Sequence, residues 1–538
     1  MFKSYASKMI GLLIVLSMFL TSCGAAATVA PTTAAPATSA AATAAPATAA
    51  ATAAPATAAP ANLPTLDIYF VSYTFKDADM AAVTAAANAI LAKDIGAKIA
   101  LHPLDFTNGA TKANLIIQSA EPCDLMVYGG FNPIQPAIDA GGIIPLEDLL
   151  PKDAPTEWGN FTQKAWDSTK VGGHVYGAMD YAIGGINGAA AFWVRKDLVD
   201  KYNFDWQNAK TPEAWEPFFD AVLKGEKGVT PLISSDPFWG RAWWPNQHGY
   251  DPITTTIGAK GDFGGSIGVK MDDPTRTVVS VADTPEYKAA VTLNRQWYLK
   301  GYYLKTPPAD AEMINIRGNL GFSAFYVPFG GFTSTDAMSK NEWNGVPILT
   351  GFVQDQLYQS LYSAGNSYGI CKTSKNPDLA AKFIEEVNTN ADFLNLLSYG
   401  IEGKNWVWAD QANKVVTYPT GVDAKTTGWP FGNGLGGDQR LQYLTSEGDV
   451  GLADKIAAEK KNALFSNMAG FTLDTSQMES DIANVSSAAT QYCDPVDKGL
   501  VDVDSGLKAC QAGLKAAGIY TVIAEVQKQV DAWAATQK

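Results

Sequence analysis

The spacing of apolar residues near the start of the chain's body, residues 64–128, alternates between strand and helix patterns. Residues 66–71 and 97–104 have the short apolar runs of strands, and 78–95 has helical spacing. A further helical pattern around 112–119 leads to a strand pattern at 124–128. The order strand, helix, strand, helix, strand predicts a parallel sheet with helices on its faces.

Helical patterns return in the C-terminal half. Asn376 and Pro377 supply an N-cap and a first-turn proline to one helix, and Gly400 ends the next. Residues 519–533 carry Ile, Val and Trp three and four positions apart, which predicts an amphipathic closing helix. The chain has 538 residues, so its body is long enough for two domains with sizeable cores.

The N-terminal 22 residues have the layout of a secretory signal. Lys3 and Lys8 precede an apolar run, residues 9–20, that is too short to span a bilayer comfortably. Leu20-Thr-Ser-Cys23 resembles the lipobox of bacterial lipoproteins, which implies removal of residues 1–22 and acylation of Cys23. We therefore expect an extracytoplasmic protein, anchored to the cell membrane by lipid on Cys23. A soluble secreted protein with an incidental cysteine is the alternative.

Residues 24–62 contain Ala, Thr, Pro and Ser and no charged residue. The repeated prolines would break a helix, so we predict a disordered tether over 23–63 that holds the body away from the membrane. A glycosylated stalk is the alternative.

The formal net charge is −14, which argues against nucleic acid as a partner because its phosphates would be repelled. The chain has three histidines, far apart in the sequence, which argues against a His-rich metal site. We expect no cofactor. Asp494, Asp497, Asp502 and Asp504 lack the twelve-residue calcium-loop pattern, so a solvated acidic loop is the simpler interpretation.

The cysteines fit an oxidising compartment. Cys493 and Cys510 bracket a short Asp- and Gly-rich segment and are a possible disulfide. Cys123 and Cys371 flank strand patterns, and we interpret both as small buried apolar residues.

Several motifs occur in the order found in one known family. They are Asp124-Leu-Met, residues 142–150 (GIIPLEDLL), 192–202 (FWVRKDLVDKY), 211–215 (TPEAW), 374–383 (SKNPDLAAKF) and 399–403 (YGIEG). Together they resemble the extracellular solute-binding lipoproteins of bacterial ABC importers, in their carbohydrate-type branch. Pro217 interrupts the family pattern that follows 211–215.

The resemblance implies an α/β fold of the two-lobe, periplasmic-binding-protein-like (type II) class, with an interlobe cleft and a hinge. We expect lobe 1 to comprise 64–180 with 357–400, and lobe 2 to comprise 184–353 with 401–538. Residues 181–188 are glycine-rich and form the expected first crossing between the lobes. The implied function is capture of a carbohydrate, expected to be an oligosaccharide, by a non-enzymatic monomer that delivers it to the ABC permease.

A cleft for sugar needs flat aromatic rings beside polar groups, because a pyranose has an apolar C–H face and a rim of hydroxyls. Clusters of this kind suggest the ligand-binding candidates Tyr181, Asp236, Trp239, Arg241, Trp243, Trp244, Phe325, Tyr326, Phe329, Trp406 and Trp429. Core packing is an alternative for every tryptophan among them.

Two matches to enzyme motifs lack the structural context that each motif requires. Residues 365–369 match G-x-S-x-G, but a strand pattern follows the serine where a helix is required. Residues 432–437 match G-x-G-x-x-G without a preceding strand, so a dinucleotide site is disfavoured. A lipid-anchored glycoside hydrolase with two facing carboxylates remains the main alternative function, and a surface adhesin is a third.

Overall fold

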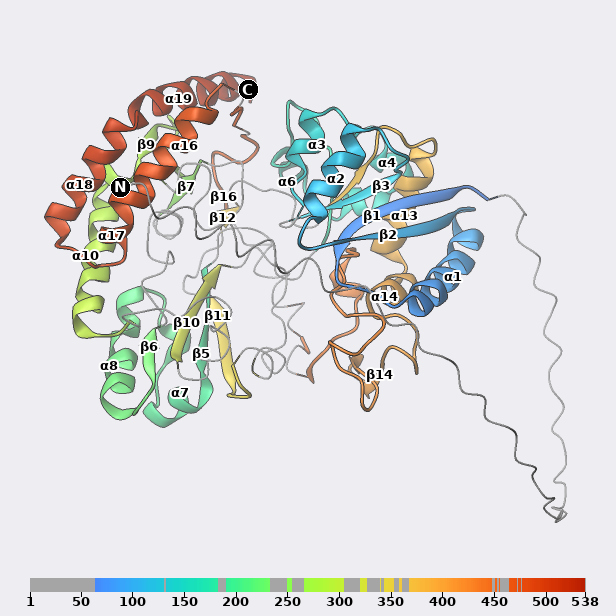
Figure 1. The fold of residues 1–538 in the computed structure, drawn as a ribbon, viewed down its shortest axis with the longest axis horizontal. Coiled ribbons are helices and arrows are strands. Elements are labelled where there is room, and N and C mark those ends of the chain that lie inside the picture. The colour runs from blue at the N-terminus through green and yellow to red at the C-terminus, as the bar shows by residue number, and fades with distance from the viewer. Residues whose placement is uncertain are drawn as a thin grey trace, which may run out of the picture. The chain divides into compact units, whose positions relative to one another are not determined.

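The computed structural model describes most of the body of the chain (Figure 1). The described residues are 63–129, 132–181, 190–232, 249–253, 266–303, 320–326, 339, 343–352, 358–359, 367–447, 450–451, 454, 464–471, 473–475 and 477–537. For 190–191, 320–326, 350–352, 358–359 and 464–465 only the backbone is described. The expected signal peptide, the lipidation site Cys23 and the tether lie outside these ranges.

The first lobe, residues 63–181 with 367–444, is built on a five-stranded sheet. Its elements are β1 (Thr65–Ser72), α1 (Asp77–Asp94), β2 (Lys98–Asp105), α2 (Gly109–Gln118), β3 (Leu125–Tyr128), α3 (Gln135–Asp139), α4 (Leu150–Asp153), α5 (Pro155–Gly159), α6 (Gln163–Asp167), β4 (Ala178–Met179), β13 (Ser367–Ile370), α13 (Pro377–Thr389), α14 (Ala391–Tyr399), β14 (Val407–Asp410), β15 (Val415–Thr417) and the 3-10 helix η5 (Gln439–Leu441). The strand order is β2-β1-β3-β13-β4.

Alternating side chains explain how the sheet is covered on both faces. Leu66, Ile68 and Phe70 of β1 are fully buried in one core, together with residues of α1, α13 and α14. On the other face, Met126 and Tyr128 of β3 belong to a second core with α2 and α3. Strand β3 is therefore buried on both faces, whereas β1 and β2 bury alternate side chains fully and the others only partly, as their alternating sequence pattern predicts.

A disulfide between Cys123 and Cys371 joins the start of β3 to the end of β13. The two cysteines are 248 residues apart in the sequence and both are buried. The expectation that they are unlinked buried residues was wrong about their bonding. Sequence offered no sign of the pairing, because only the antiparallel alignment of β3 with β13 brings the two residues together.

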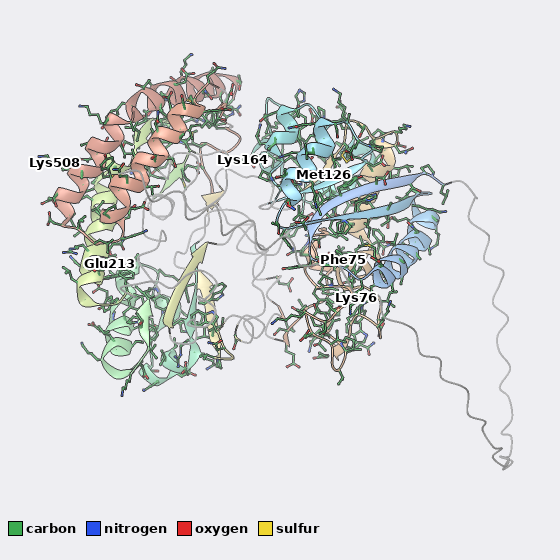
Figure 2. The ribbon with its side chains drawn as sticks, viewed as in Figure 1. Phe75, Lys76, Met126, Lys164, Glu213 and Lys508 are labelled. Carbon is green, nitrogen blue, oxygen red and sulfur yellow. A yellow bond between two sulfur atoms is a disulfide. The ribbon has the colours of Figure 1, made fainter. Side chains whose placement is uncertain are left out.

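Residues 401–444 pack on the first lobe, whereas the sequence-based division grouped them with the second. The buried carboxylate of Asp79, on α1, accepts a hydrogen bond from Asn405 Nδ2 (2.6 Å) and pairs with Lys404 (3.0 Å). Phe75 and Lys76, labelled in Figure 2, follow β1. The centroids of the Phe75 and Trp429 rings are 4.6 Å apart, and Lys76 Nζ donates to the carbonyl of Thr426 (2.7 Å). These contacts bind the segment to α1 and to the loop between β1 and α1.

The second lobe is formed by the described residues within 190–352 and 464–537, which contain two smaller sheets. Its elements are β5 (Ala190–Arg195), α7 (Lys196–Tyr202), η1 (Trp206–Asn208), η2 (Pro212–Trp215), α8 (Glu216–Gly225), β6 (Thr230–Leu232), β7 (Tyr250–Pro252), β8 (Ile267–Lys270), β9 (Val278–Ser280), η4 (Val281–Asp283), α10 (Pro285–Lys300), β10 (Leu320–Tyr326), β11 (Ile348–Phe352), α16 (Glu479–Ala488), the π-helical turn η7 (Ala489–Cys493), α17 (Asp494–Asp497), α18 (Val503–Ala516) and α19 (Ile519–Thr536). The strand orders are β11-β5-β10-β6 and β7-β8-β9. Two further short strands, β12 (Tyr358–Gln359) and β16 (Leu464–Phe465), pair in parallel with each other.

Helix α10 belongs to both cores of the second lobe. Tyr287 and Val291 face the core formed by β7-β8-β9 and the C-terminal helices, while Leu293 and Trp297 face the aromatic core around Trp215. The Tyr287 hydroxyl donates to the carboxylate of Asp497 (2.5 Å). The helix thereby ties the two sheets of this lobe together.

The C-terminal helices are linked to one another by a disulfide and to the β7-β8-β9 sheet by a hydrogen bond. A disulfide between Cys493 and Cys510 links η7 to α18 and confirms the predicted pair. The side-chain carbonyl of Gln527, on α19, accepts a hydrogen bond from the backbone N–H of Val278 (2.7 Å). None of the helices in the described ranges is both long and apolar enough to cross a membrane.

Candidate functional site

The carboxyl ends of four strands of the first lobe meet at one edge of the sheet. Strands β1, β2 and β3 run parallel, and β4 runs the same way because β13 is antiparallel to both β3 and β4. The chain places β2 on one side of β1 and β3 on the other, so strand order reverses beside β1. Ligands of open α/β sheets bind outside the carboxyl ends of the strands at such a reversal. We call this the carboxyl edge.

Two exposed aromatic rings stand at the carboxyl edge. Tyr73 directly follows β1 and Phe106 directly follows β2, and their side chains are 52% and 42% exposed. The ring centroids are 4.9 Å apart in an edge-to-face arrangement. Exposed apolar surface is expected where a ligand will cover it. Sequence reasoning missed both residues, although their positions directly after two adjacent parallel strands could have indicated them.

A second aromatic pair, Tyr418 and Phe431, lies close to Tyr73. The two rings stack with centroids 4.0 Å apart, and the Tyr418 hydroxyl oxygen accepts the Phe431 backbone N–H (3.0 Å). Burial raises the pKa of the Tyr418 hydroxyl, and the nearby Tyr73 adds to that rise. Both rings are half-buried.

The glycine-rich stretch 432–437 lines the carboxyl edge from β1 to β4. The carbonyl of Asn433 accepts a hydrogen bond from Ser72 Oγ (2.5 Å), and that of Gly436 accepts one from the Tyr368 hydroxyl (3.0 Å). Gly434 has φ +85°, and a Cβ there would lie 2.7 Å from the carbonyl oxygen of Val71. The glycines therefore allow backbone to approach the sheet, which accounts for the G-x-G-x-x-G match without a dinucleotide.

Substituting Gly434 by alanine is expected to destabilise the first lobe by about 1–3 kcal/mol, because the change combines a positive φ with a clash against a carbonyl. Urea unfolding with a first-lobe probe measures the loss. Gly403→Ala is a suitable control, since Gly403 also has a positive φ (+77°) but no atom within 4 Å of the added Cβ. Equal losses for the two variants would contradict the role assigned to close approach.

At the β4 end of the carboxyl edge, Arg440 covers Tyr181. The Arg440 guanidinium lies 3.7 Å from the Tyr181 ring centroid. Its Nε donates to both carboxylate oxygens of Asp438 (2.8 and 3.0 Å), and its Nη2 donates to Asn160 Oδ1 (2.8 Å). The Asp438 carboxylate raises the pKa of Arg440 further. One face of Tyr181 is therefore occupied by a cation, and the exposed member of this pair is Arg440.

Other sequence-based candidates have different locations. Trp429 is fully buried in the first-lobe core, where its indole N–H donates to the carbonyl of Leu397 (2.9 Å). Trp406 is buried beside Trp408, and its N–H donates to the carbonyl of Gly400 (3.0 Å). Both rings serve packing, so the structure does not offer them to a solute.

The remaining candidates belong to the second lobe. Phe325 and Tyr326 lie at the end of β10, paired with Ala191 and Ala190 of β5, and their side chains are not described. The others lie outside the described residues: Asp236, Trp239, Arg241, Trp243, Trp244 and Phe329.

Neither a serine nucleophile nor a metal site is found among the described residues. Ser367, the serine of the G-x-S-x-G match, is buried within β13, and strand continues after it, as predicted. Within the described ranges, no group of three or more His, Cys, Asp and Glu side chains is placed to hold a metal ion.

Comparison with known proteins identifies the family of the chain. Residues 74–392 match the family model described as "Bacterial extracellular solute-binding protein", and 467–535 match a "Domain of unknown function (DUF3502)". A carbohydrate ABC transporter substrate-binding protein of Streptococcus pneumoniae serotype 4 is 22% identical over 462 residues, which cover 84% of this chain and 88% of that protein.

Solved structures give the same fold. The N-glycan transport solute-binding protein NgtS of S. pneumoniae aligns with a TM-score of 0.72 and 21% identity, over 88% of this chain and all of that one. A solute-binding protein of Bifidobacterium longum infantis, described as HMO-binding and associated with an ABC transporter, aligns with a TM-score of 0.57 and 14% identity, over 88% of this chain and 99% of that one. With more than half of its length matched by the family model, the chain belongs to the bacterial extracellular solute-binding proteins, which bind their solutes without enzymatic activity.

Proposed function

We propose that this protein captures an oligosaccharide outside the membrane and delivers it to an ABC permease. The observation that carries the proposal is the exposed pair Tyr73 and Phe106 at the carboxyl edge of the first-lobe sheet. An apolar sugar face can lie on such rings while its hydroxyl groups bond to neighbouring polar groups. The relative that is named a carbohydrate-binding transporter component supports the same class of solute.

The length of the carboxyl edge favours more than one sugar unit. Strand β4 is three strands away from β1, and neighbouring strands are about 4.8 Å apart, so Tyr73 and Tyr181 are separated by about 14 Å along the edge. NgtS has been solved with Man1GlcNAc and with Man5GlcNAc, at TM-scores of 0.62 and 0.59 to this chain. Mannose-containing N-glycan fragments are therefore the first solutes to test.

The second lobe would cover the other side of the solute. We propose that the lobes close over the sugar and that the glycine-rich crossing expected at residues 181–188 acts as one hinge. The aromatic and polar residues 236–244, with Phe325, Tyr326 and Phe329, are the proposed second-lobe contacts. Closure is driven only by contacts that the closed state adds, so rings on both lobes would favour it.

The N-terminus completes the proposal. The lipobox-like Leu20–Cys23 and the proline-containing tether would hold a monomeric binding protein at the membrane surface, within reach of its permease. Labelling of whole cells with a fatty-acid analogue, compared with a Cys23→Ala variant, tests the anchor. Label retained by the variant would remove Cys23 from the proposal.

Replacing Tyr73 by alanine is expected to weaken binding of Man5GlcNAc about tenfold, because an aromatic platform contributes roughly 1.5 kcal/mol. Phe106→Ala should have a similar effect. Isothermal titration calorimetry of the purified protein measures the dissociation constant. Leu223→Ala, which removes another exposed apolar side chain on α8, is the matched control.

The outcomes separate the parts of the proposal. Wild-type affinity in both ring variants would remove the carboxyl edge as the binding site. If the protein bound amino acids or peptides and no glycan, the proposed class of solute would be wrong. The Tyr73→Ala and Phe106→Ala variants would then test whether that solute binds at the carboxyl edge.

A further inference from the structure

Behind Arg440 and Tyr181 lies a group of buried acids that includes unpaired oxygen atoms. Glu157, on α5, is fully buried, and neither of its carboxylate oxygens has a hydrogen-bond partner among the described residues. Asp180, directly after β4, is buried, and its Oδ2 is likewise unpartnered within the described part of the chain. A buried ionised carboxylate without hydrogen bonds is strongly unfavourable.

The surroundings of this pair are mostly negative. Asp438 and Arg440 face it from the stretch around η5, Glu385 from α13, and Tyr368 from β13. Arg440 is already bound by Asp438, and Glu385 is held by the backbone N–H groups of Thr156 and Glu157 (3.0 and 3.1 Å). One guanidinium therefore faces four carboxyl groups, which favours neutral acids at Glu157 and Asp180.

We propose that Glu157 and Asp180 form a buried proton-binding pair that keeps Arg440 stacked on Tyr181. The pair is neutral in the folded protein. Loss of its protons would place negative charge beside Asp438, so the ion pair of Asp438 and Arg440 would rearrange. That movement would displace Tyr181, whose carbonyl accepts the Gln439 backbone N–H (3.0 Å). The inference that this affects solute binding rests on the proposed function, whereas the effect on the first lobe does not.

The direction of the pH effect follows from burial. Burial raises the pKa of both carboxyl groups well above their ordinary values, and neighbouring acids raise them further. The folded state then holds protons that the unfolded chain releases. The stability this provides is complete below the unfolded pKa of about 4 and is lost as pH rises through the folded pKa values. For each group, the unfolding equilibrium constant rises up to tenfold per pH unit in that interval.

Amide substitutions test the proposal, because Gln and Asn keep the shape of the neutral acids and cannot ionise. We expect Glu157→Gln and Asp180→Asn, singly and together, to flatten the dependence of first-lobe stability on pH between 5 and 9. Glu213→Gln, which changes an exposed acid of the second lobe, is the control and should leave the dependence unchanged (Figure 2). An unaltered pH dependence in the double variant would overturn the proposal.

Two measurements on the intact protein do not require the variants to fold. Calorimetric unfolding of the wild type at several pH values between 5 and 9, in buffers of different ionisation enthalpy, should show a release of protons beyond what the exposed acids account for. Hydrogen exchange of the Gln439 amide, corrected for its intrinsic rate, should lose protection as pH rises. No excess proton release, or protection that is constant with pH, would contradict the proposal.

A solute titration separates this inference from the proposed function. Wild-type protein titrated with Man5GlcNAc at pH 6 and pH 8.5 should bind more weakly at the higher pH, and the double variant should not. If no glycan binds at any pH but the proton release is observed, the proton-binding pair is supported and the proposed solute is contradicted. If the glycan binds equally well at both pH values, the link between the pair and the solute is overturned.

Discussion

Replacing Cys123 and Cys371 together by serine is expected to lower the free energy of unfolding of the first lobe by about 5 kcal/mol. The disulfide closes a loop spanning 248 residues, and long closed loops restrict the unfolded chain most in the chain-entropy description. It also joins strands that lie side by side in the sheet. Urea unfolding of oxidised wild type and of the double variant, followed by fluorescence, measures the difference.

The second disulfide provides the comparison. Cys493 and Cys510 are separated by 17 residues, so the matching double serine variant should lose about 3 kcal/mol, in the transition of the second lobe. Hydrogen exchange assigns each loss to its lobe. If the two variants lost equal stability, loop length would not govern the effect.

Replacing Trp429 by alanine is expected to cost about 3–5 kcal/mol of first-lobe stability. The indole is fully buried between the loop after β1 and α14, and its removal leaves a cavity. The carbonyl of Leu397 also loses its donor, although Asn433 Nδ2 still bonds to it (2.8 Å). Chemical denaturation measures the loss, and Trp429→Phe should recover part of it.

Trp408→Ala is the control for this substitution, because Trp408 is only half-buried and should cost less. A Trp429→Ala protein of wild-type stability that no longer bound solute would restore Trp429 as a ligand contact.

The sequence predicted the parallel part of the first lobe closely. The strand expected at 66–71 is β1 (Thr65–Ser72), the helix at 78–95 is α1 (Asp77–Asp94), and the strand at 97–104 is β2 (Lys98–Asp105). These segments alternate in apolar spacing because one face of each is buried, so local pattern and tertiary structure agree. The two-lobe α/β fold was inferred from motif order and is confirmed by the family match.

Segment 401–444 was harder to place because its contacts are not periodic. Its strands β14 and β15 have only four and three residues, and it is fixed by single side chains such as Asn405 on Asp79. Hydrogen bonds between residues 326 apart leave no local pattern. The same holds for the disulfide between Cys123 and Cys371.

The candidate site could be predicted only in part from the sequence, for a related reason. The sequence does not distinguish a tryptophan that packs in the core from one that binds a ligand, because the difference is the burial of the side chain in the folded protein. Trp406 and Trp429 proved to be packing residues, whereas the exposed rings are Tyr73 and Phe106. The role of Tyr181 shifted as well, since Arg440 lies over its ring.

The sharing of α10 between two cores bears on how the C-terminal region can be inherited. The match to the domain of unknown function covers only 467–535, yet its helices bury apolar side chains against residues that precede them by about two hundred positions, including Ile267, Val278 and Tyr287. A gene that lost these last helices would leave an apolar sheet surface uncovered on the second lobe. Recombination should therefore move this helical segment between proteins only together with a matching partner sheet, and its boundaries as a sequence family do not coincide with those of an autonomous folding unit.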